Sequence, residues 1–378
     1  MTTAITAATW TTAGNLPTAA AWHGQHDGPV TLGAGFVLVA GGADAAGGSL
    51  ADAALFDPDP TKLTWVPAHA MITPRRLHSL TLLPTGKVLA VGGLDGDTPL
   101  LSAELYDPGK DEWKHTGFLE TARWGHSATL LPDGSVLVAG GSAPRSVGGT
   151  TALRSAERFD PDQSEWRPAA VMTAARTAHT ALPLAEGGVV LVVGGVQPVG
   201  AADDPALAFC ELYDVEHDKW LPTGSLLRGR RHHRATALSD TTVLVTGGTA
   251  PGSPGTAPYD PFSQRTVELF ELGAGTWTAQ DPMPSGRALH RAVALPDDKV
   301  LVAGGAAGDR DEAGFRSALV RDGHEWTPAA GLTTGRWSFA ATALTGGRVL
   351  VAGGVTRSGL AAADPTSAEL TRTTEVFA

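Results

Sequence analysis

Short hydrophobic runs, rich in valine, leucine and alanine, recur along the chain, and each run ends in a pair of glycines. The run at 135–139 and the two glycines after it are typical of the set. The pairs lie roughly fifty residues apart, and a repeat of this period indicates one supersecondary unit that is copied and packed against its neighbours. The seven pairs are Gly41-Gly42, Gly92-Gly93, Gly140-Gly141, Gly194-Gly195, Gly247-Gly248, Gly304-Gly305 and Gly353-Gly354.

The third copy shows the order of elements most clearly. A strand at 127–131 is followed by Pro-Asp-Gly at 132–134, a turn signal that joins antiparallel strands. The second strand, 135–139, is hydrophobic throughout, as expected for a strand buried on both faces. A third strand at 156–159 and a fourth around Trp166 follow. Each unit is therefore predicted to be a four-stranded antiparallel meander, in which the glycine pair permits close approach of another backbone.

These units resemble the kelch repeat, and the resemblance covers essentially the whole chain. It is carried by the glycine pair, by a Glu-Leu-Tyr-Asp strand at 104–107 and again at 211–214, and by a tryptophan downstream of that strand. The resemblance implies a β-propeller, in which each unit forms one blade. The downstream tryptophans are Trp65, Trp113, Trp166, Trp220, Trp277 and Trp326.

The missing seventh tryptophan of this series predicts how the ring closes. The chain ends in a strand pattern at 375–377, while Trp10 stands alone before the first copy. Residues 5–12 are therefore expected to complete the blade begun by residues 336–377, which removes the exposed edges of an open array. The predicted fold is all-β: residues 1–378 form a single seven-bladed kelch-type β-propeller with four antiparallel strands per blade.

Loop lengths indicate which face of the ring carries function. In such a meander, the connections between blades and the loops between second and third strands emerge on one face. Those loops differ from one another, as at 142–153 and 249–265, whereas the turns between first and second strands are short and uniform. Binding residues concentrate on irregular loops held by a rigid scaffold. We call this face the variable-loop face and expect the site there or at the mouth of the channel.

An Arg-x-x-His sequence precedes the first strand of most copies. The first copy has Ala20 in place of the arginine, and the seventh has Phe339 in place of the histidine. Because the first strand is innermost in such rings, the arginines are expected near the channel, where they would form an anion site. The predicted substrate-binding residues of this series are Arg75, Arg123, Arg176, Arg230, Arg287 and Arg336.

The histidines of the same series suggest two roles. Neutral imidazole can act as a base or hold Zn, Cu, Fe or Ni. The predicted catalytic residues are His126, His179, His233 and His290, and the predicted metal ligands are His23, His78, His126 and His179. A structural alternative stays open, because a residue present in every copy is often one that the repeat requires. In that case each arginine would pair with a glutamate of a neighbouring blade, and each histidine would bond to backbone.

Three tryptophans fall outside the fourth-strand series. Trp22, Trp124 and Trp337 all lie within the Arg-x-x-His segments. Their rings offer apolar area and a π face to an aromatic or cationic guest, so they are predicted to contact the substrate. The alternative is that they fill the channel or pack against a loop.

Composition and charge narrow the possible partners. The chain has 378 residues, of which 42% are hydrophobic and 18% charged, as in globular proteins. Its formal net charge of −11 argues against nucleic acid as a partner. The single cysteine, Cys210, excludes an internal disulfide and is predicted to be a buried, inert thiol. No apolar stretch is long enough for a membrane span, and no signal peptide is evident, so a cytoplasmic location is predicted.

Two functions follow from these patterns. The first is an enzyme acting on a small anionic metabolite with an apolar or aromatic part, such as a lyase, cyclase, isomerase or oxidase with a transition metal held by histidines. The second is a non-catalytic kelch scaffold that binds an acidic peptide or protein on the same face. Kelch copper-radical oxidases need a tyrosine cross-linked to a cysteine. The three tyrosines and Cys210 fall in third strands or a distal loop here, so that chemistry is not expected.

Overall fold

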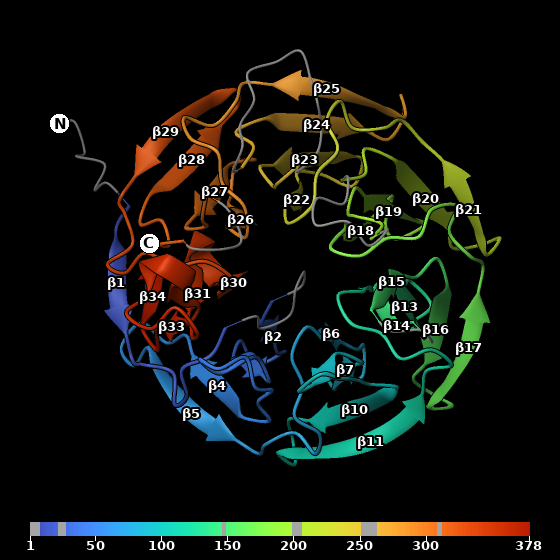
Figure 1. The fold of residues 1–378 in the computed structure, drawn as a ribbon, viewed down its shortest axis with the longest axis horizontal. Helices are drawn as coiled ribbons and strands as arrows, with labels where there is room; N and C mark the ends of the chain where they lie inside the picture. The colour runs from blue at the N-terminus through green and yellow to red at the C-terminus, as the bar shows by residue number, and fades with distance from the viewer. Residues whose placement is uncertain (1–7, 22–27, 146–148, 199–205, 251–262, 308–311) are drawn as a thin grey trace.

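The hydrophobic runs form the second strands of seven four-stranded antiparallel sheets, arranged in a ring around a central axis (Figure 1). The computed structural model describes residues 8–21, 28–145, 149–198, 206–250, 263–307 and 312–378. The predicted seven-bladed propeller is confirmed. Each sheet is one blade, numbered 1 to 7 in chain order.

The strands of each blade follow one another outward from the axis. The first strands are β2 (Val30–Thr31), β6 (Ser79–Leu82), β12 (Ser127–Leu130), β18 (Thr180–Leu184), β22 (Arg234–Ala237), β26 (Arg291–Ala294) and β30 (Ala340–Ala343). The second strands, which are almost wholly buried, are β3 (Val37–Ala40), β7 (Val88–Val91), β13 (Val136–Ala139), β19 (Val189–Val193), β23 (Thr242–Thr246), β27 (Val300–Ala303) and β31 (Val349–Ala352).

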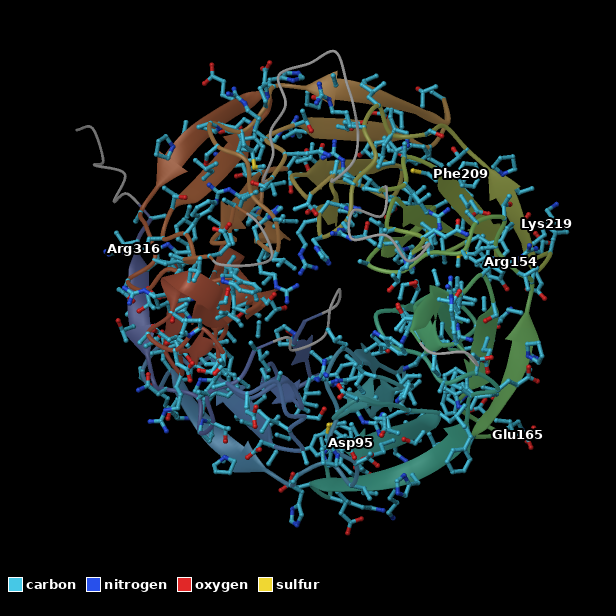
Figure 2. All side chains as sticks on the ribbon, in the orientation of Figure 1. Asp95, Arg154, Glu165, Phe209, Lys219 and Arg316 are labelled. Carbon is cyan, nitrogen blue, oxygen red and sulfur yellow. The ribbon has the colours of Figure 1, made fainter. Side chains whose placement is uncertain are left out.

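The outer half of each blade is built from its third and fourth strands. The third strands are β4 (Ala53–Asp57), β10 (Ser102–Asp107), β16 (Ala156–Asp160), β20 (Cys210–Asp214), β24 (Val267–Glu271), β28 (Ala318–Asp322) and β34 (Thr374–Phe377). The fourth strands are β5 (Thr64–Ala68), β11 (Glu112–Phe118), β17 (Glu165–Ala169), β21 (Lys219–Pro222), β25 (Thr276–Gln280), β29 (Glu325–Ala329) and β1 (Trp10–Ala13). In Figure 2, Glu165 and Lys219 of these fourth strands lie at the outer edge of the ring.

Short elements in the loops complete the described structure. Three two-stranded hairpins extend the loops between second and third strands: β8 (Leu94–Asp95) with β9 (Thr98–Pro99), β14 (Ser142–Pro144) with β15 (Thr150–Ala152), and β32 (Val355–Arg357) with β33 (Glu369–Leu370). Two single-turn 3₁₀ helices are η1 (Thr345–Gly347) and η2 (Gly359–Ala361). Within the described ranges, the longest helix is one turn and is too short to cross a bilayer.

The N-terminal strand closes the ring, but it spans Trp10–Ala13 in place of the predicted residues 5–12, and residues 5–7 lie outside the described structure. β1 pairs antiparallel with β34, with Trp10 opposite Phe377. The Trp10 indole N–H donates to the carbonyl of Ala330 in blade 6 at 2.7 Å. Equivalent tryptophans of blades 2 to 6 donate to a carbonyl of the chain that leads into their own blade, for example Trp113 to His69 and Trp220 to Ala170, whereas Trp65 of blade 1 donates to the hydroxyl of Thr374. Trp10 therefore serves blade 7 as the tryptophans of blades 2 to 6 serve theirs.

The glycine pairs are required by close backbone contacts, the first glycine with the next blade and the second with its own blade. A Cβ on Gly92 would lie 2.5 Å from the carbonyl oxygen of Arg123 in the next blade, and one on Gly93 would lie 2.6 Å from that of Arg76. Both glycines also have positive φ, at 57° and 94°. A side chain at either position would force neighbouring backbone apart. The first glycine therefore sets how closely two blades approach, and the second sets how closely the turn packs on its own blade.

The two kinds of variable connection lie side by side, as the prediction of a variable-loop face requires. Isolated bridges join the segment before each first strand to the loop that follows the glycine pair, as between Arg76 and Leu94 and between Trp124 and Ser142. Cys210 is fully buried in blade 4, and burial raises the pKa of its thiol to about 11. The thiol is therefore protonated and unreactive at neutral pH.

Candidate functional site

The six repeat arginines lie inside the blades, with no exposed surface. In each of these blades, one guanidinium nitrogen, Nη1, donates to two carbonyls. One carbonyl belongs to the first glycine of the pair. The other belongs to the residue directly before the third strand, or in blade 2 to its first residue, as for Arg75 with Gly92 and Ser102. The glycine carbonyls that accept these bonds are those of Gly92, Gly140, Gly194, Gly247, Gly304 and Gly353.

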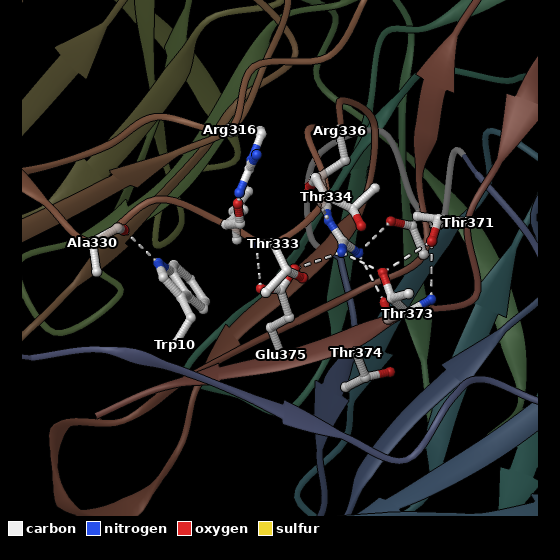
Figure 3. A network of polar contacts seen from close by, with 12 residues as sticks. Trp10, Arg316, Ala330, Thr333, Thr334, Arg336, Thr371, Thr373, Thr374 and Glu375 are labelled. Atoms are coloured by element: carbon white, nitrogen blue, oxygen red, sulfur yellow. Dashed lines mark hydrogen bonds and ion pairs between the residues drawn. The ribbon is translucent and has the colours of Figure 1, made fainter.

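Five of the six arginines also pair with a buried glutamate of the same blade. The N–O distances range from 2.5 to 2.9 Å, and Arg75 and Glu104 lie 2.6 Å apart. The carboxylate of Glu104 additionally accepts the backbone N–H groups of Ile72 and Thr73. Figure 3 shows the corresponding network in blade 7, where Arg336 faces Glu375. The pairs are Arg75–Glu104, Arg123–Glu157, Arg176–Glu211, Arg230–Glu268 and Arg336–Glu375.

This placement differs from the expected position near the channel, and the substrate-binding role of the six arginines stays a prediction. Their guanidinium groups turn into the blade because the carbonyls at the sharp glycine turn need donors that no strand supplies. The structural alternative describes them better, although the glutamate comes from the same blade and not from a neighbouring one. Burial lowers the pKa of the Arg75 guanidinium, and the nearby Glu104 carboxylate opposes that shift.

The histidines are likewise part of the blade contacts. His78, His126, His179, His233 and His290 are all at least nine-tenths buried. In four of them Nε2 shares a hydrogen bond of 2.8–3.0 Å with a hydroxyl of the preceding blade, and the pairs are His126–Ser79, His179–Ser127, His233–Thr180 and His290–Thr246. Burial, helped by nearby arginines, lowers the pKa of His126 to about 3 and holds the pKa of His179, His233 and His290 well below 6.5.

These contacts do not favour the predicted catalytic and metal-binding roles. A general base needs a pKa near the working pH and reach to a substrate, and neither holds for His126, His179, His233 or His290. Across the described residues, no three His, Cys, Asp or Glu side chains gather as a metal would require. His78, His126 and His179 are thus not brought together around one point, and His23 lies outside the described residues.

The additional tryptophans are not gathered at one mouth either. Trp337 is 2% exposed and packs with Ala288, Leu289 and Val355. Trp124 is half-buried in blade 3, where its backbone pairs with Ser142. Trp22 lies outside the described residues. Trp337 therefore packs between loops of blades 6 and 7, in agreement with the structural alternative.

A cavity of about 460 Å³ occupies the central channel. The first strands of blades 3 to 7 line it, mostly with alanine, threonine, leucine and valine. Its charged lining residues within the described structure are Arg234 and Arg291, which are 8% and 5% exposed. They begin the first strands of blades 5 and 6, and their Nε atoms donate to the carbonyls of His290 and Phe339 in the following blade.

Sequence reasoning missed these two arginines, although a signal was present. They stand directly after the repeat histidine, where blades 2 to 4 have Ser79, Ser127 and Thr180. Those hydroxyls bond the next histidine, so an arginine there removes a partner. His290 bonds Thr246 of the second strand instead, and in blade 7 the histidine is itself replaced by Phe339. The exceptions to the repeat thus compensate one another across blades 5, 6 and 7.

Exposed hydrophobic side chains concentrate on the variable-loop face. Five of the eight large ones in the described structure belong to its loops, and Phe118 is the last residue of the fourth strand β11. The other two, Val66 and Leu221, lie within fourth strands. Phe118 is 66% exposed and Leu360 is 83% exposed. Large exposed apolar side chains gathered on one face are typical of an interaction surface. The six are Ile72, Leu101, Phe118, Val171, Leu227 and Leu360.

Comparison with known families agrees with the geometry. The family model of the Kelch motif matches residues 75–115 and 123–173, which are blades 2 and 3 with the segments before them. Residues 75–115 and 123–173 therefore carry kelch motifs. Among curated proteins, Kelch-like protein 34 of Homo sapiens is 29% identical over 207 residues, which cover 43% of this chain. This chain spans 31% of the length of that relative.

Two solved structures share the kelch propeller fold. The structure of YjhT has a TM-score of 0.60 and 16% identity, covering 80% of this chain and 95% of its own. A fungal alcohol oxidase of the AA5 family, in complex with copper, has a TM-score of 0.69 and 17% identity, covering 98% of this chain and 75% of its own. Identities this low establish the fold and leave the function to the site.

Proposed function

We propose that this protein is a non-catalytic binding propeller that docks a partner protein through its variable-loop face. The observation that carries the proposal is the concentration of exposed apolar side chains on that face. Leu101 and Phe118 are neighbours there, because the amide of Leu119 donates to the carbonyl of Leu101. Ile72, Val171 and Leu227 extend the apolar surface over blades 2 to 5.

The buried repeat residues support a binding role over an enzymatic one. The arginines that the repeat offers bond within their own blades through Nη1 and Nη2, and four of the histidines bond the preceding blade through Nε2. The described residues do not fit a transition metal, since they supply no cluster of three ligating side chains. The curated relative and the kelch scaffolds that the sequence resembles are also consistent with a protein partner.

The test compares matched leucines on and off the proposed face. Leu227→Glu changes a residue of the variable-loop face, and Leu221→Glu makes the same change on the fourth strand β21. Purified protein is cross-linked in an extract of its own cells, and bound proteins are identified and then re-tested as purified components. We expect one partner to bind the unaltered protein and L221E equally and to bind L227E at least about tenfold more weakly. Equal binding to all three would contradict the proposal.

The channel supports a second candidate function, which is the binding of a small anion. Two guanidinium groups line a cavity in a protein of net charge −11, and arginine suits carboxylate and phosphate groups. Titration with inorganic phosphate and with small carboxylates, followed by calorimetry, tests this function. Saturable binding that is lost in Arg234→Gln and Arg291→Gln would support it. Heats that do not change in these variants would contradict it.

A further inference from the structure

Blade 1 lacks the buried ion pair that five other blades contain. Ala20 stands where those blades have arginine, and its carbonyl accepts the amide of Gly354 as the carbonyl of Arg75 accepts that of Gly42. Ala54 stands where they have glutamate: it is the second residue of β4, opposite Val39. Both members of the pair are thus absent together, so neither leaves a buried charge without its counterion.

The place of the missing guanidinium is a cavity of about 130 Å³. Its lining includes Ala20, Ala54, Gly41 and Asp52, which are the blade 1 counterparts of the arginine and of groups that surround it in blade 2. The correspondence is fixed by backbone bonding, since the amide of Gly41 donates to the carbonyl of Asp52 as that of Gly92 donates to Ser102. The exposed residues Pro17, Asp52 and Pro67 also line the cavity, so it reaches the surface.

The acceptors of a guanidinium are retained in this cavity. The carbonyl positions of Gly41 and Asp52 correspond to those that receive Nη1 in the six other blades. Asp52 also changes the chemistry of the site, because most other blades have serine or threonine there, and those hydroxyls bond Nη2. Its carboxylate accepts the hydroxyl of Thr18 at 3.1 Å. Blade 1 therefore brings a negative charge to the mouth of a cavity that has no cation of its own among its lining residues.

The backbone has adapted to the loss of the glutamate. In blades with glutamate, the carboxylate accepts the amide of the residue at the position of Ile72. Blade 1 has Pro17 at this position and blade 6, whose glutamate is replaced by Leu319, has Pro284. Proline has no N–H, so neither blade is left with a buried donor there. The cavity is therefore part of a self-consistent variant of the repeat.

We propose that this pocket binds the guanidinium group of an arginine side chain on the partner protein. The inference rests on the proposed function for the source of the arginine, and on the pocket alone for its chemistry. Six blades of the same chain show how a guanidinium fits the site: a planar fork donates through one nitrogen to two carbonyls and through the other to the third-strand side chain. An ammonium group has no such fork and cannot satisfy these acceptors in the same way. The pocket opens on the variable-loop face, close to the loop that contains Asp52.

Methylguanidinium and methylammonium, titrated separately into the intact protein, test the chemistry of the pocket. We expect saturable one-to-one binding of methylguanidinium, followed by NMR shifts or calorimetry, and at least about tenfold weaker binding of methylammonium. Ala20→Arg should abolish binding, because the new side chain fills the pocket as its counterparts do in six blades. Asp52→Asn should weaken binding by about tenfold or more, the size of one charge-assisted hydrogen bond. The matched control is Asp97→Asn, which removes an exposed carboxylate on the same face and should leave binding unchanged.

Two outcomes would overturn the proposal. One is methylguanidinium binding of equal strength in the unaltered protein and in A20R. The other is the absence of saturable binding to the unaltered protein. Neither outcome would contradict the partner-binding function, because that function is tested separately with L227E. Loss of partner binding in L227E together with normal partner binding in A20R would support the docking face. It would also show that the partner does not insert an arginine into the pocket.

Discussion

Blades 2 and 6 bury an arginine in the same place and satisfy it in different ways. In blade 2, Arg75 reaches Glu104, and the same carboxylate holds two amides of the preceding segment. In blade 6, Leu319 replaces the glutamate, and Arg287 bonds the hydroxyls of Ser285 and Ser317. Its guanidinium also lies 5.7 Å from the ring centre of Phe315.

The difference shows which contacts of the buried arginine every such blade keeps and which can vary from blade to blade. The bonds to the glycine-turn carbonyls are present in all six arginine-containing blades, with or without the carboxylate. The glutamate has the further task of tying down the preceding segment. Burial alone lowers the pKa of Arg287 to about 10, which still leaves it charged at neutral pH. Blade 1 shows the third solution, in which both members of the pair are lost.

The largest expected effect is a loss of stability in acid. Burial lowers the pKa of His126 to about 3, and the pKa values of His179, His233 and His290 are also depressed. The unfolded chain binds protons below pH 6.5 while the folded chain does not. The contribution of these histidines to the free energy of unfolding is therefore complete above pH 6.5. It is lost as the pH drops toward about 3. Thermal melting across this range measures the effect.

Blade 7, which has Phe339 at the histidine position, supplies the control. In the variant Ser79→Ala/His126→Phe one buried histidine is replaced in the same way, and its hydroxyl partner is removed with it. The melting temperature of this variant should fall less steeply with pH than that of the unaltered protein. An unchanged slope would mean that His126 is not a buried neutral group.

The next largest effect is expected from imposing the blade 6 residue on blade 2. Glu104→Leu leaves the Arg75 charge without its counterion and two amides without an acceptor. Breaking such a buried pair costs about 3–5 kcal/mol of unfolding free energy, which denaturant titration can measure. Glu104→Leu/Ile72→Pro removes one of the orphaned amides and should recover part of the loss. A cost below about 1 kcal/mol for the single variant would show that the carboxylate does not stabilise blade 2.

A smaller effect tests the compensation between blades 5 and 6. Thr246→Ala removes the hydroxyl that bonds His290 Nε2 at 2.8 Å. Leaving a buried polar atom without that bond costs about 1–3 kcal/mol in the same measurement. Thr246→Ser keeps the hydroxyl and should lose less. If the alanine and serine variants are equally stable, the hydroxyl is not what the histidine needs.

The smallest expected effect is an increase in the free energy of unfolding. Leu319→Glu offers Arg287 the counterion that five other blades possess and should raise the unfolding free energy by about 1 kcal/mol. The gain is limited because Pro284 has no amide for the new carboxylate to accept. Leu319→Gln is the matched uncharged control. A destabilised L319E with a normal L319Q would show that blade 6 has adapted fully to the absence of the charge.

Much of the fold could be predicted because it depends on patterns that repeat. The period of the glycine pairs, the hydrophobic second strands and the isolated Trp10 were sufficient for seven blades and for closure by the N-terminal strand. The candidate site was harder to predict. Arg234 and Arg291 line the channel, yet in the sequence they are exceptions to the repeat beside the more regular Arg-x-x-His residues.

The sequence by itself determined the architecture of this protein, since the glycine pairs, the hydrophobic second strands and the recurring tryptophans act through local geometry and identical neighbours. Only the tertiary structure decided what the charged residues do. The Arg-x-x-His segment precedes a strand and has no fixed side-chain alternation, so its sequence does not say whether a guanidinium faces the channel or turns beneath the glycine pair. The unpaired carbonyls of that turn and the low polarity inside the blade settle the direction, and they exist only once the strands are assembled.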